Sequence, residues 1–218
     1  MVFEPTAVVL ALSIIILLFS VIVHEVMHGY VARMFGDHTA ENAGRLTLNP
    51  IPHIDPVGTI LLPGMLLFLN FISPGSGGFL IGWAKPVPVN PLHFKDIRKG
   101  ELLVSLAGVG ANFFLALLGA VLYHISGGFL QNDLLTEIFK FMTGINLMLG
   151  VFNLLPVPPL DGSKALLALL PYNLAREYEK LTPYGFMIII ALLYFNVLSF
   201  ILSFILLPLY LLLGVPPI

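Results

Sequence analysis

Two histidines and a glutamate stand together at the end of a long apolar run in this chain. The sequence His24-Glu25-Val26-Met27-His28 follows directly on residues 7–23, whose only polar members are Ser13 and Ser20. On a helix, side chains at i and i+4 lie on one face, so both imidazoles could bind one metal ion. The glutamate between them has the position of a general base in a zinc hydrolase. The pattern predicts a Zn²⁺ site within an apolar helix, with one ion per chain.

Two histidines do not complete such a site, because catalytic zinc usually has three protein ligands and a water molecule. Asp161 is the best candidate for the third ligand, because it closely follows an apolar span that is broken by Pro156, Pro158 and Pro159. A carboxylate near hydrocarbon is costly unless it is paired or bound to metal. In the alternative interpretation, Asp161 caps the helix that begins at Gly162.

The composition indicates a membrane protein. The chain has 218 residues, of which 58% are hydrophobic and 10% charged, and its mean hydropathy is +0.97. A soluble domain carries roughly 25% charged residues, so this chain has too little charge to cover a globular surface. The absence of cysteine excludes disulfides and cysteine-bound zinc. A net charge of −2 gives no sign of a nucleic-acid partner.

The elements that must position these side chains are membrane helices. A membrane-spanning helix needs about 20 mainly apolar residues, and residues 6–35, 101–126 and 136–162 form three strong candidates. The N-terminus lacks the basic segment of a signal peptide, so the first helix is expected to remain in the mature protein. The three spans would carry all the proposed metal ligands.

The region 57–90 is predicted to be less regular. Residues 57–72 are apolar but contain Pro63-Gly64, which favours a segment that re-enters the membrane rather than crossing it. Pro86 and Pro88 exclude a helix and suit an exposed strand edge, so we expect a small β-hairpin at membrane level.

The predicted fold is an all-α polytopic membrane protein with about four to six membrane helices. The whole chain, 1–218, is expected to be a single domain, and residues 163–215 should contain its C-terminal helices. Residues 184–215 are too long for one untilted span. They form either one long tilted helix or two segments broken near Asn196.

The distribution of positive charge predicts the orientation. No Lys or Arg precedes the first span, whereas Arg33 and Arg45 follow it. Because positively charged loops remain in the cytoplasm, the N-terminus should lie outside the cell. The helical rise then places His24 toward the inner face, below the membrane surface. We therefore expect a multi-pass protein of the cell membrane whose site faces the cytoplasmic side.

Several motifs together resemble the site-2 protease family of intramembrane zinc metalloproteases. They are HEVMH at 24–28, the sequence Asn-x-x-Pro-x-Pro-x-Leu-Asp-Gly at 153–162, GWAKPVPVN at 82–90, and LAGVGAN at 106–112. The last stretch has Val109 where the family usually has proline. Asn49-Pro50 and HIDPVGT at 53–59 are similar to a compact prokaryotic branch that has neither a PDZ nor a CBS domain.

The resemblance implies a zinc endopeptidase that cleaves transmembrane helices of membrane-tethered proteins in the bilayer. His24, His28 and Asp161 would bind Zn²⁺, and Glu25 would take a proton from the zinc-bound water and later protonate the leaving amine. Asn153 matches the family position whose amide stabilises the tetrahedral oxyanion.

A helical substrate would have to unwind before cleavage, because its carbonyls are held in internal hydrogen bonds. The residues from 85 to 90 could then bind the unwound strand by β-augmentation. These substrate-binding candidates are Lys85, Pro86, Val87, Pro88, Val89 and Asn90.

Other interpretations remain open at the level of sequence. Intramembrane histidines, aspartates and broken helices also mark metal or proton transporters, although the chain shows no internal repeat and transport needs no glutamate beside the histidines. A zinc hydrolase acting on lipid is a third class. Asn112 and Asn146 are interpreted as hydrogen-bond partners between helices. His53 and Asp55 form either a satisfied loop pair or a gate for water or substrate. The oligomeric state is not predicted.

Overall fold

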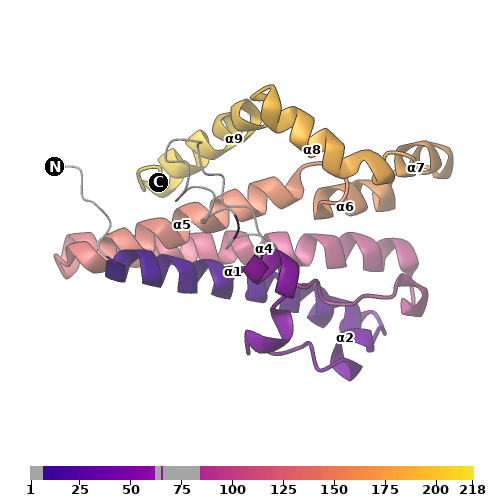
Figure 1. Ribbon diagram of the computed structural model, residues 1–218, viewed down its shortest axis with the longest axis horizontal. Helices are drawn as coiled ribbons and strands as arrows, with labels where there is room; N and C mark the ends of the chain where they lie inside the picture. Colours follow the sequence, from indigo (N-terminus) through magenta and orange to yellow (C-terminus); the bar gives the residue numbers. More distant parts are fainter. Residues whose placement is uncertain (1–6, 62–64, 66–83) are drawn as a thin grey trace.

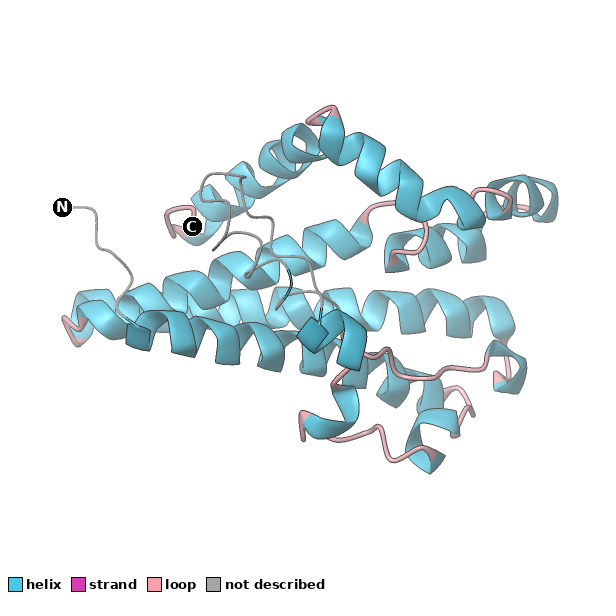
Figure 2. Ribbon diagram, viewed as in Figure 1, coloured by secondary structure: helices cyan, strands magenta, loops and turns pink. Residues whose placement is uncertain are grey.

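The computed structural model describes residues 7–61, 65 and 84–218, and every regular element in this part of the chain is helical (Figure 2). The described α-helices are α1 (Ala7–Met34), α2 (Thr39–Asn42), α4 (Ile97–His124), α5 (Asp133–Leu154), α6 (Asp161–Leu169), α7 (Tyr172–Glu179), α8 (Gly185–Tyr194) and α9 (Val197–Leu213). Short 3-10 helices are η1 (Ile51–His53), η3 (Pro91–His93) and η5 (Thr182–Tyr184), and π-helices are η2 (Pro56–Leu61) and η4 (Ile125–Phe129).

Helices α1, α4 and α5 run side by side as a long bundle (Figure 1). These are the three helices, among the described residues, that are long and apolar enough to cross a membrane, with η4 extending α4. Each of the three strong spans predicted from sequence overlaps one of these helices, although α5 ends at Leu154 and the third span was predicted to continue to residue 162. A fourth span exists only if the chain from Tyr172 to Leu213 is counted as one bent segment. The predicted range of four to six membrane helices is not confirmed.

Helix α4 lies at the centre of the bundle. Half of its most apolar window is buried, compared with 17% for α1. Along α1, large apolar side chains such as Leu10, Ile15 and Phe19 point outward and are exposed. An outward-facing apolar surface of this kind fits a helix that faces lipid. The burial pattern is thus that of a multi-pass membrane protein.

Local sequence explains where α4 and α5 begin and where α5 ends. The side chains of Asp96 and Asn132 accept hydrogen bonds from the first backbone N–H groups of α4 and α5, from Lys99 and Leu135 respectively. Helix α5 ends at Leu154, two residues before Pro156, as the proline pattern predicted. The chain then turns back and begins α6 at Asp161.

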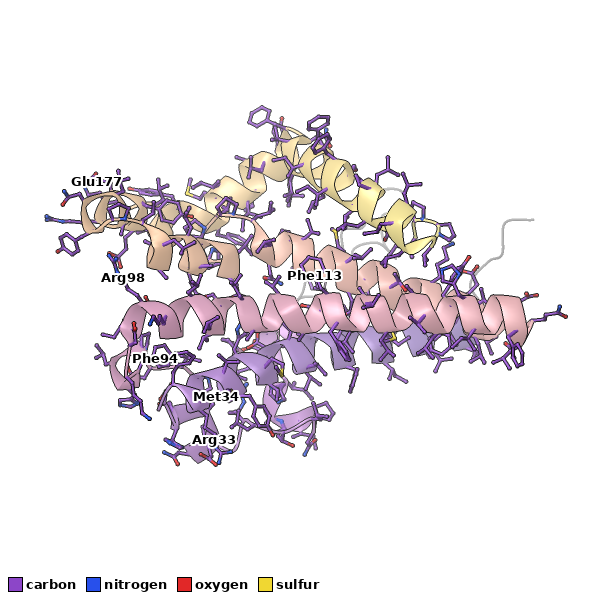
Figure 3. All side chains as sticks on the ribbon, turned by 180° about the vertical axis from the view of Figure 1, so that it is seen from behind. Arg33, Met34, Phe94, Arg98, Phe113 and Glu177 are labelled. Carbon is purple, nitrogen blue, oxygen red and sulfur yellow. The ribbon has the colours of Figure 1, made fainter. Side chains whose placement is uncertain are left out.

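The C-terminal helices α8 and α9 form an arch over α5 (Figure 1). They are separate helices that meet at 79°, with Asn196 in the left-handed conformation between them (φ 57°). The second of the two sequence interpretations is therefore correct. Phe113 projects from α4 toward this arch (Figure 3) and packs against the same two buried clusters as Leu206 and Leu209 of α9.

The predicted β-hairpin in region 57–90 is not supported. Residues 84–90 are extended but are not paired with another strand among the described residues. Their backbone N–H groups bond instead to a loop carbonyl and to carboxylate side chains, and two of the seven residues are prolines that cannot donate. Of the predicted re-entrant segment 57–72, only η2 and residue 65 are described, so its main part lies outside the described residues.

The extended segment 84–90 is fastened at both ends. Near its start, the Lys85 N–H donates to the His53 carbonyl (2.9 Å), and the Arg45 guanidinium donates to the Lys85 carbonyl (2.7 Å). At its end, the Asn90 N–H donates to Asp37 (2.7 Å). His53 itself is buried and bonds the Thr47 carbonyl. Among the described residues His53 is part of a packed loop, but its Nδ1 has no hydrogen-bond partner, so neither interpretation of His53 and Asp55 is confirmed.

Asp37 is the main anchor of this region. Its carboxylate is fully buried and accepts hydrogen bonds from the Thr39 N–H and hydroxyl, the Asn90 N–H and the His93 ring. Burial alone would raise its pKa, but the Thr39 hydroxyl, the Asn90 N–H and the His93 ring together lower the pKa to about 2. The ionised form is therefore the one that the fold stabilises.

Replacing Asp37 with Asn should lower the free energy of unfolding by about 1–3 kcal/mol at neutral pH, because buried donors lose a charged acceptor. Since the folded pKa (about 2) lies below the unfolded value of 3.8, the stabilisation is complete above the unfolded value and is lost as the pH falls toward about 2. The difference in Tm between wild type and Asp37→Asn in detergent should therefore shrink on acidification. The control is Asp133→Asn, at an exposed position. Equal Tm values for wild type and Asp37→Asn at neutral pH would contradict the anchoring role.

Candidate metal centre

Three side chains from two distant segments meet inside the bundle. His24 and His28 lie one turn apart on α1, and Asp161 is the first residue of α6. The two Nε2 atoms are 3.0 Å apart, and each is 3.1 Å from Oδ2 of Asp161. All three residues are buried. The ligand atoms lie within 4.8 Å of one another, close enough to bind one metal ion.

Hydrogen bonds on the far side of each ring determine which nitrogen faces the centre. His28 Nδ1 lies 2.7 Å from the Val104 backbone carbonyl, which can only accept, so Nδ1 carries the proton. His24 Nδ1 lies 2.6 Å from Oδ1 of Asn112, which also accepts. In the neutral tautomers, both Nε2 lone pairs therefore point toward the Asp161 carboxylate. Three acceptor atoms at this separation repel one another unless a cation lies between them.

The donor set fits Zn²⁺. Two imidazoles and one carboxylate are a ligand set of catalytic zinc, which leaves a fourth position for water. A tetrahedral ion with bonds of about 2.0–2.1 Å separates its ligand atoms by about 3.3 Å, close to the edges of the triangle that the three side chains form. The Nδ1–H bonds to Val104 and Asn112 supply the outer partners that such histidines usually have.

The position of Asp161 depends on how α6 packs. A Cβ on Gly162 would collide with the carbonyls of Leu154 and Leu155 at the end of α5, so glycine allows α6 to start directly against α5. The other carboxylate oxygen of Asp161 pairs with Lys164 (3.2 Å). No side chain caps the N-terminus of α6. The carboxylate is directed to the two histidines and Lys164, and the capping interpretation is wrong.

Helix α4 supplies the other wall of the centre. Val104, Gly108 and Asn112 are spaced by four residues and therefore share one face of the helix. A Cβ on Gly108 would lie 2.5 Å from Nε2 of His28 and 2.7 Å from Nε2 of His24. Only glycine leaves room for the imidazoles and an ion between α1 and α4.

Glu25 lines a cavity of about 260 Å³ beside the centre, together with His28 and Asp161. One of its carboxylate oxygens accepts a hydrogen bond from the Val87 N–H (2.8 Å). The cavity thus contains a carboxylate that the chain holds in place near the three candidate ligands. Its remaining described lining residues are Pro86, Val87, Val89, Pro91, Phe94, Glu101, Val104, Ser105 and Lys164.

The comparisons with known proteins agree with this geometry. Residues 124–196 match peptidase family M50. YwhC of Bacillus subtilis (strain 168), which carries the name of a zinc metalloprotease, is 40% identical over 185 residues, or 82% of this chain and 78% of YwhC. This chain belongs to the site-2 protease family, peptidase family M50. It is a zinc metalloprotease, and Zn²⁺ is its cofactor.

Other relatives of this site-2 protease carry similar names. Rip2 of Mycolicibacterium smegmatis (strain ATCC 700084 / mc(2)155) is 32% identical over 179 residues, or 81% of this chain and 64% of Rip2. Zinc metalloprotease MJ0392 of Methanocaldococcus jannaschii is 27% identical over 206 residues, or 94% of this chain and 48% of MJ0392. No solved structure matches the chain significantly.

The structure places the remaining predicted site residues at different distances from the centre. Pro86, Val87 and Val89 line the cavity, whereas Lys85 and Asn90 serve as the two fastened ends of the extended segment. Asn153 lies in the last turn of α5, where its amide donates to the Leu149 carbonyl (3.0 Å) and does not line the cavity.

Sequence reasoning missed several residues of the site-2 protease centre. Gly108 was noted only as part of a resemblance, and Glu101, Ser105 and Lys164 were not assigned to the cavity. Asn112 was interpreted as a hydrogen-bond partner between helices, which its bond to Asn146 confirms, but its bond to His24 was not predicted. The spacing of four between Gly108 and Asn112 was the one available signal, because it places both on the same face of α4. Every residue has a backbone carbonyl, so the role of the Val104 carbonyl could not be predicted from the residue type.

Gly108→Ala should abolish zinc binding, because a methyl group would occupy the space between the two Nε2 atoms. The purified variant should contain nearly no zinc by elemental analysis, while its helical circular dichroism signal stays near that of wild type. Gly110→Ala is the matched control, since a Cβ there meets nothing within 4 Å. Full zinc content in Gly108→Ala would show that the ion does not bind at this triangle.

Proposed function

We propose that this site-2 protease is an endopeptidase that cleaves transmembrane helices of membrane-tethered proteins within the bilayer. The observation that carries the proposal is the triangle of His24, His28 and Asp161. It is buried among helices of which α1, α4 and α5 are long and apolar enough to span a membrane. A peptide bond that reaches this triangle has to enter the bundle at membrane level.

In the proposed mechanism, His24, His28 and Asp161 hold the metal ion. Zn²⁺ bound there would supply Lewis acidity, which lowers the pKa of a water molecule and polarises the scissile carbonyl. Glu25 accepts the proton from the attacking water and later delivers it to the leaving amine. The Val87 N–H fixes one oxygen of Glu25, so the other oxygen is the one available for the proton.

Asn153 is proposed to donate its amide to the oxyanion that forms during the reaction. It lies at the end of α5, and Asp161 follows after the proline-rich turn. Its amide bonds the Leu149 carbonyl in this structure, so it would exchange that acceptor for the oxyanion when the substrate is bound.

The extended segment from Lys85 to Asn90 is proposed to bind the unwound substrate strand by β-augmentation. Among the described residues of this segment, one backbone N–H remains available as a donor for this role. The N–H groups of Lys85, Val87 and Asn90 are already bonded within the chain, and Pro86 and Pro88 have none. The Val89 N–H has no partner among the described residues, and Val89 lines the cavity.

We further propose that the metal centre faces the cytoplasm and that the N-terminus lies outside. Helices α2, α6 and α7 and the start of α4 gather at one end of the bundle (Figure 1). Of the ten Lys and Arg residues, all except Lys140 belong to that end or to the loops near it. These nine are Arg33, Arg45, Lys85, Lys95, Arg98, Lys99, Lys164, Arg176 and Lys180. Such a concentration of positive charge is typical of a cytoplasmic face.

Glu25→Gln should retain zinc and lose peptide cleavage, because the amide cannot accept the proton while the three metal ligands are unchanged. The rate of cleavage of a model transmembrane substrate by the purified, zinc-loaded protein should fall by about 10²–10⁴-fold. Zinc content by elemental analysis should equal that of wild type.

Two further measurements in the same experiment test the role of Asn153 and the alternative that the protein is a transporter. Asn153→Ala should lower kcat by about 10²–10³-fold with zinc retained, as for loss of one oxyanion donor. Zinc uptake into liposomes that survives in Glu25→Gln, without any cleaved substrate in wild type, would favour the transporter and contradict proteolysis.

Val89→Pro should weaken substrate binding by removing one backbone donor while keeping the extended conformation. A single backbone hydrogen bond predicts a loss of about 2–10-fold in kcat/KM, mainly through KM. Val89→Ala is the control, because it shortens the side chain but keeps the N–H. Substitution of Val87 cannot separate these roles, since its N–H already positions Glu25. If Val89→Pro and Val89→Ala cleave equally well, the strand is bound elsewhere.

A further inference from the structure

A circuit of hydrogen bonds, which the backbone of α1 closes, leads from the His24 ring through α4 and α5 and back to Ser20 on α1. His24 Nδ1 bonds Oδ1 of Asn112 on α4 (2.6 Å), and Nδ2 of Asn112 bonds Oδ1 of Asn146 on α5 (2.9 Å). Nδ2 of Asn146 bonds Oγ of Ser20 (2.8 Å), which lies one turn before His24 on α1. The circuit therefore connects all three helices of the central bundle.

One backbone carbonyl, that of Met142, determines which group donates and which accepts in each hydrogen bond of the circuit. Nδ2 of Asn146 also bonds the Met142 carbonyl (2.9 Å), which can only accept, so the amide side of Asn146 must face it. Oδ1 of Asn146 then faces Asn112 and requires a donor there. The NH₂ of Asn112 satisfies it, which leaves Oδ1 of Asn112 facing His24. The His24 proton must therefore be on Nδ1.

We infer that Asn112 and Asn146 are positioning residues that hold His24 in the tautomer needed for zinc binding. The inference concerns this chain's own residues and rests on the proposed metal centre. His28 obtains the same tautomer directly from the Val104 carbonyl. His24 has no backbone carbonyl at Nδ1, and its partner there is the side-chain oxygen of Asn112. The orientation of that amide is set, through Asn146, by the Met142 carbonyl.

Burial makes this arrangement specific. Asn112 and Asn146 are 0% exposed and Ser20 is 1% exposed. No water can replace a lost partner at such positions, and a half-satisfied polar network in a low-dielectric interior is costly. If the His24 proton were on Nε2, its Nδ1 would be an acceptor facing Oδ1 of Asn112. A flipped Asn112 amide would relieve that contact but would put two acceptors in contact at Asn146. The competing tautomer therefore has one unfavourable contact in either orientation of Asn112.

The first test measures zinc affinity of the full-length protein in detergent by competition with a chelator. Asn112→Leu should weaken zinc binding by about 10–100-fold, the usual effect of losing an outer partner of a metal-binding histidine. Asn146→Leu should weaken zinc binding less, because Asn112 remains but can turn either way. Asn112→Asp keeps an acceptor oxygen within reach of Nδ1 but places its second oxygen against Oδ1 of Asn146, so it should recover only part of the affinity.

The second test reads the tautomer directly. In zinc-stripped protein with ¹⁵N-labelled histidine, the NMR signals of His24 should show a proton on Nδ1 in wild type and a mixture of tautomers in Asn146→Leu. This readout does not depend on catalysis, so it also distinguishes failure of this inference from failure of the proposed protease mechanism.

Two control variants separate positioning from packing. Thr143→Val removes a buried hydroxyl on α5 that bonds only the Phe139 carbonyl of its own helix, and Ser20→Ala leaves the Met142 carbonyl in place to orient Asn146. Both should bind zinc within about twofold of wild type. The inference is overturned if Asn112→Leu binds zinc like wild type, if Thr143→Val weakens binding as much as Asn112→Leu, or if Asn146→Leu keeps the wild-type tautomer and affinity.

Discussion

Three acceptor atoms that converge without a proton between them are the constraint on which the structure depends. The Nε2 atoms of His24 and His28 and an oxygen of Asp161 lie 3.0–3.1 Å apart in the buried interior. Such an arrangement is unfavourable by itself and becomes favourable around a divalent cation. The rest of the bundle can be understood as the framework that brings these atoms together from two segments separated by more than a hundred residues.

Helix α4 contributes most to that framework, although none of the three candidate ligands lies on it. One face of it presents the Val104 carbonyl, Gly108 and Asn112 to the two histidines. The carbonyl and the amide set the tautomers of the rings, and the glycine provides the space that the rings and an ion occupy. A helix that lies at the centre of the bundle is suited to this role, because packing against α1, α5 and α6 restricts its movement.

The extended segment 84–90 connects the candidate metal centre with the loops around α2. Its ends are fastened to Asp37, Arg45 and His53 in the loops around α2, and its middle holds Glu25 through Val87. The same backbone that was expected to bind substrate therefore also positions the proposed general base. Prolines at 86 and 88 leave few donors, and in the part of the chain that the structure describes the remaining N–H groups bond the His53 carbonyl and two carboxylates instead of a neighbouring strand. This explains why an extended stretch appears where a β-hairpin was predicted.

The sequence by itself was enough to predict a zinc metalloprotease and a membrane protein. HEVMH at the end of an apolar run predicts two candidate ligands on one helical face, prolines before Asp161 predict the end of α5, and low charge indicates a membrane protein. These signals are local, because helical periodicity and proline geometry act over a few residues. Only the tertiary structure decided that Asp161 points at the histidines instead of capping α6, that Gly108 and Asn112 face the centre, and that Val87 holds Glu25. Those facts depend on how helices pack against one another. Hydrogen bonds made by backbone groups cannot be predicted from residue type, because nearly every residue has the same backbone groups.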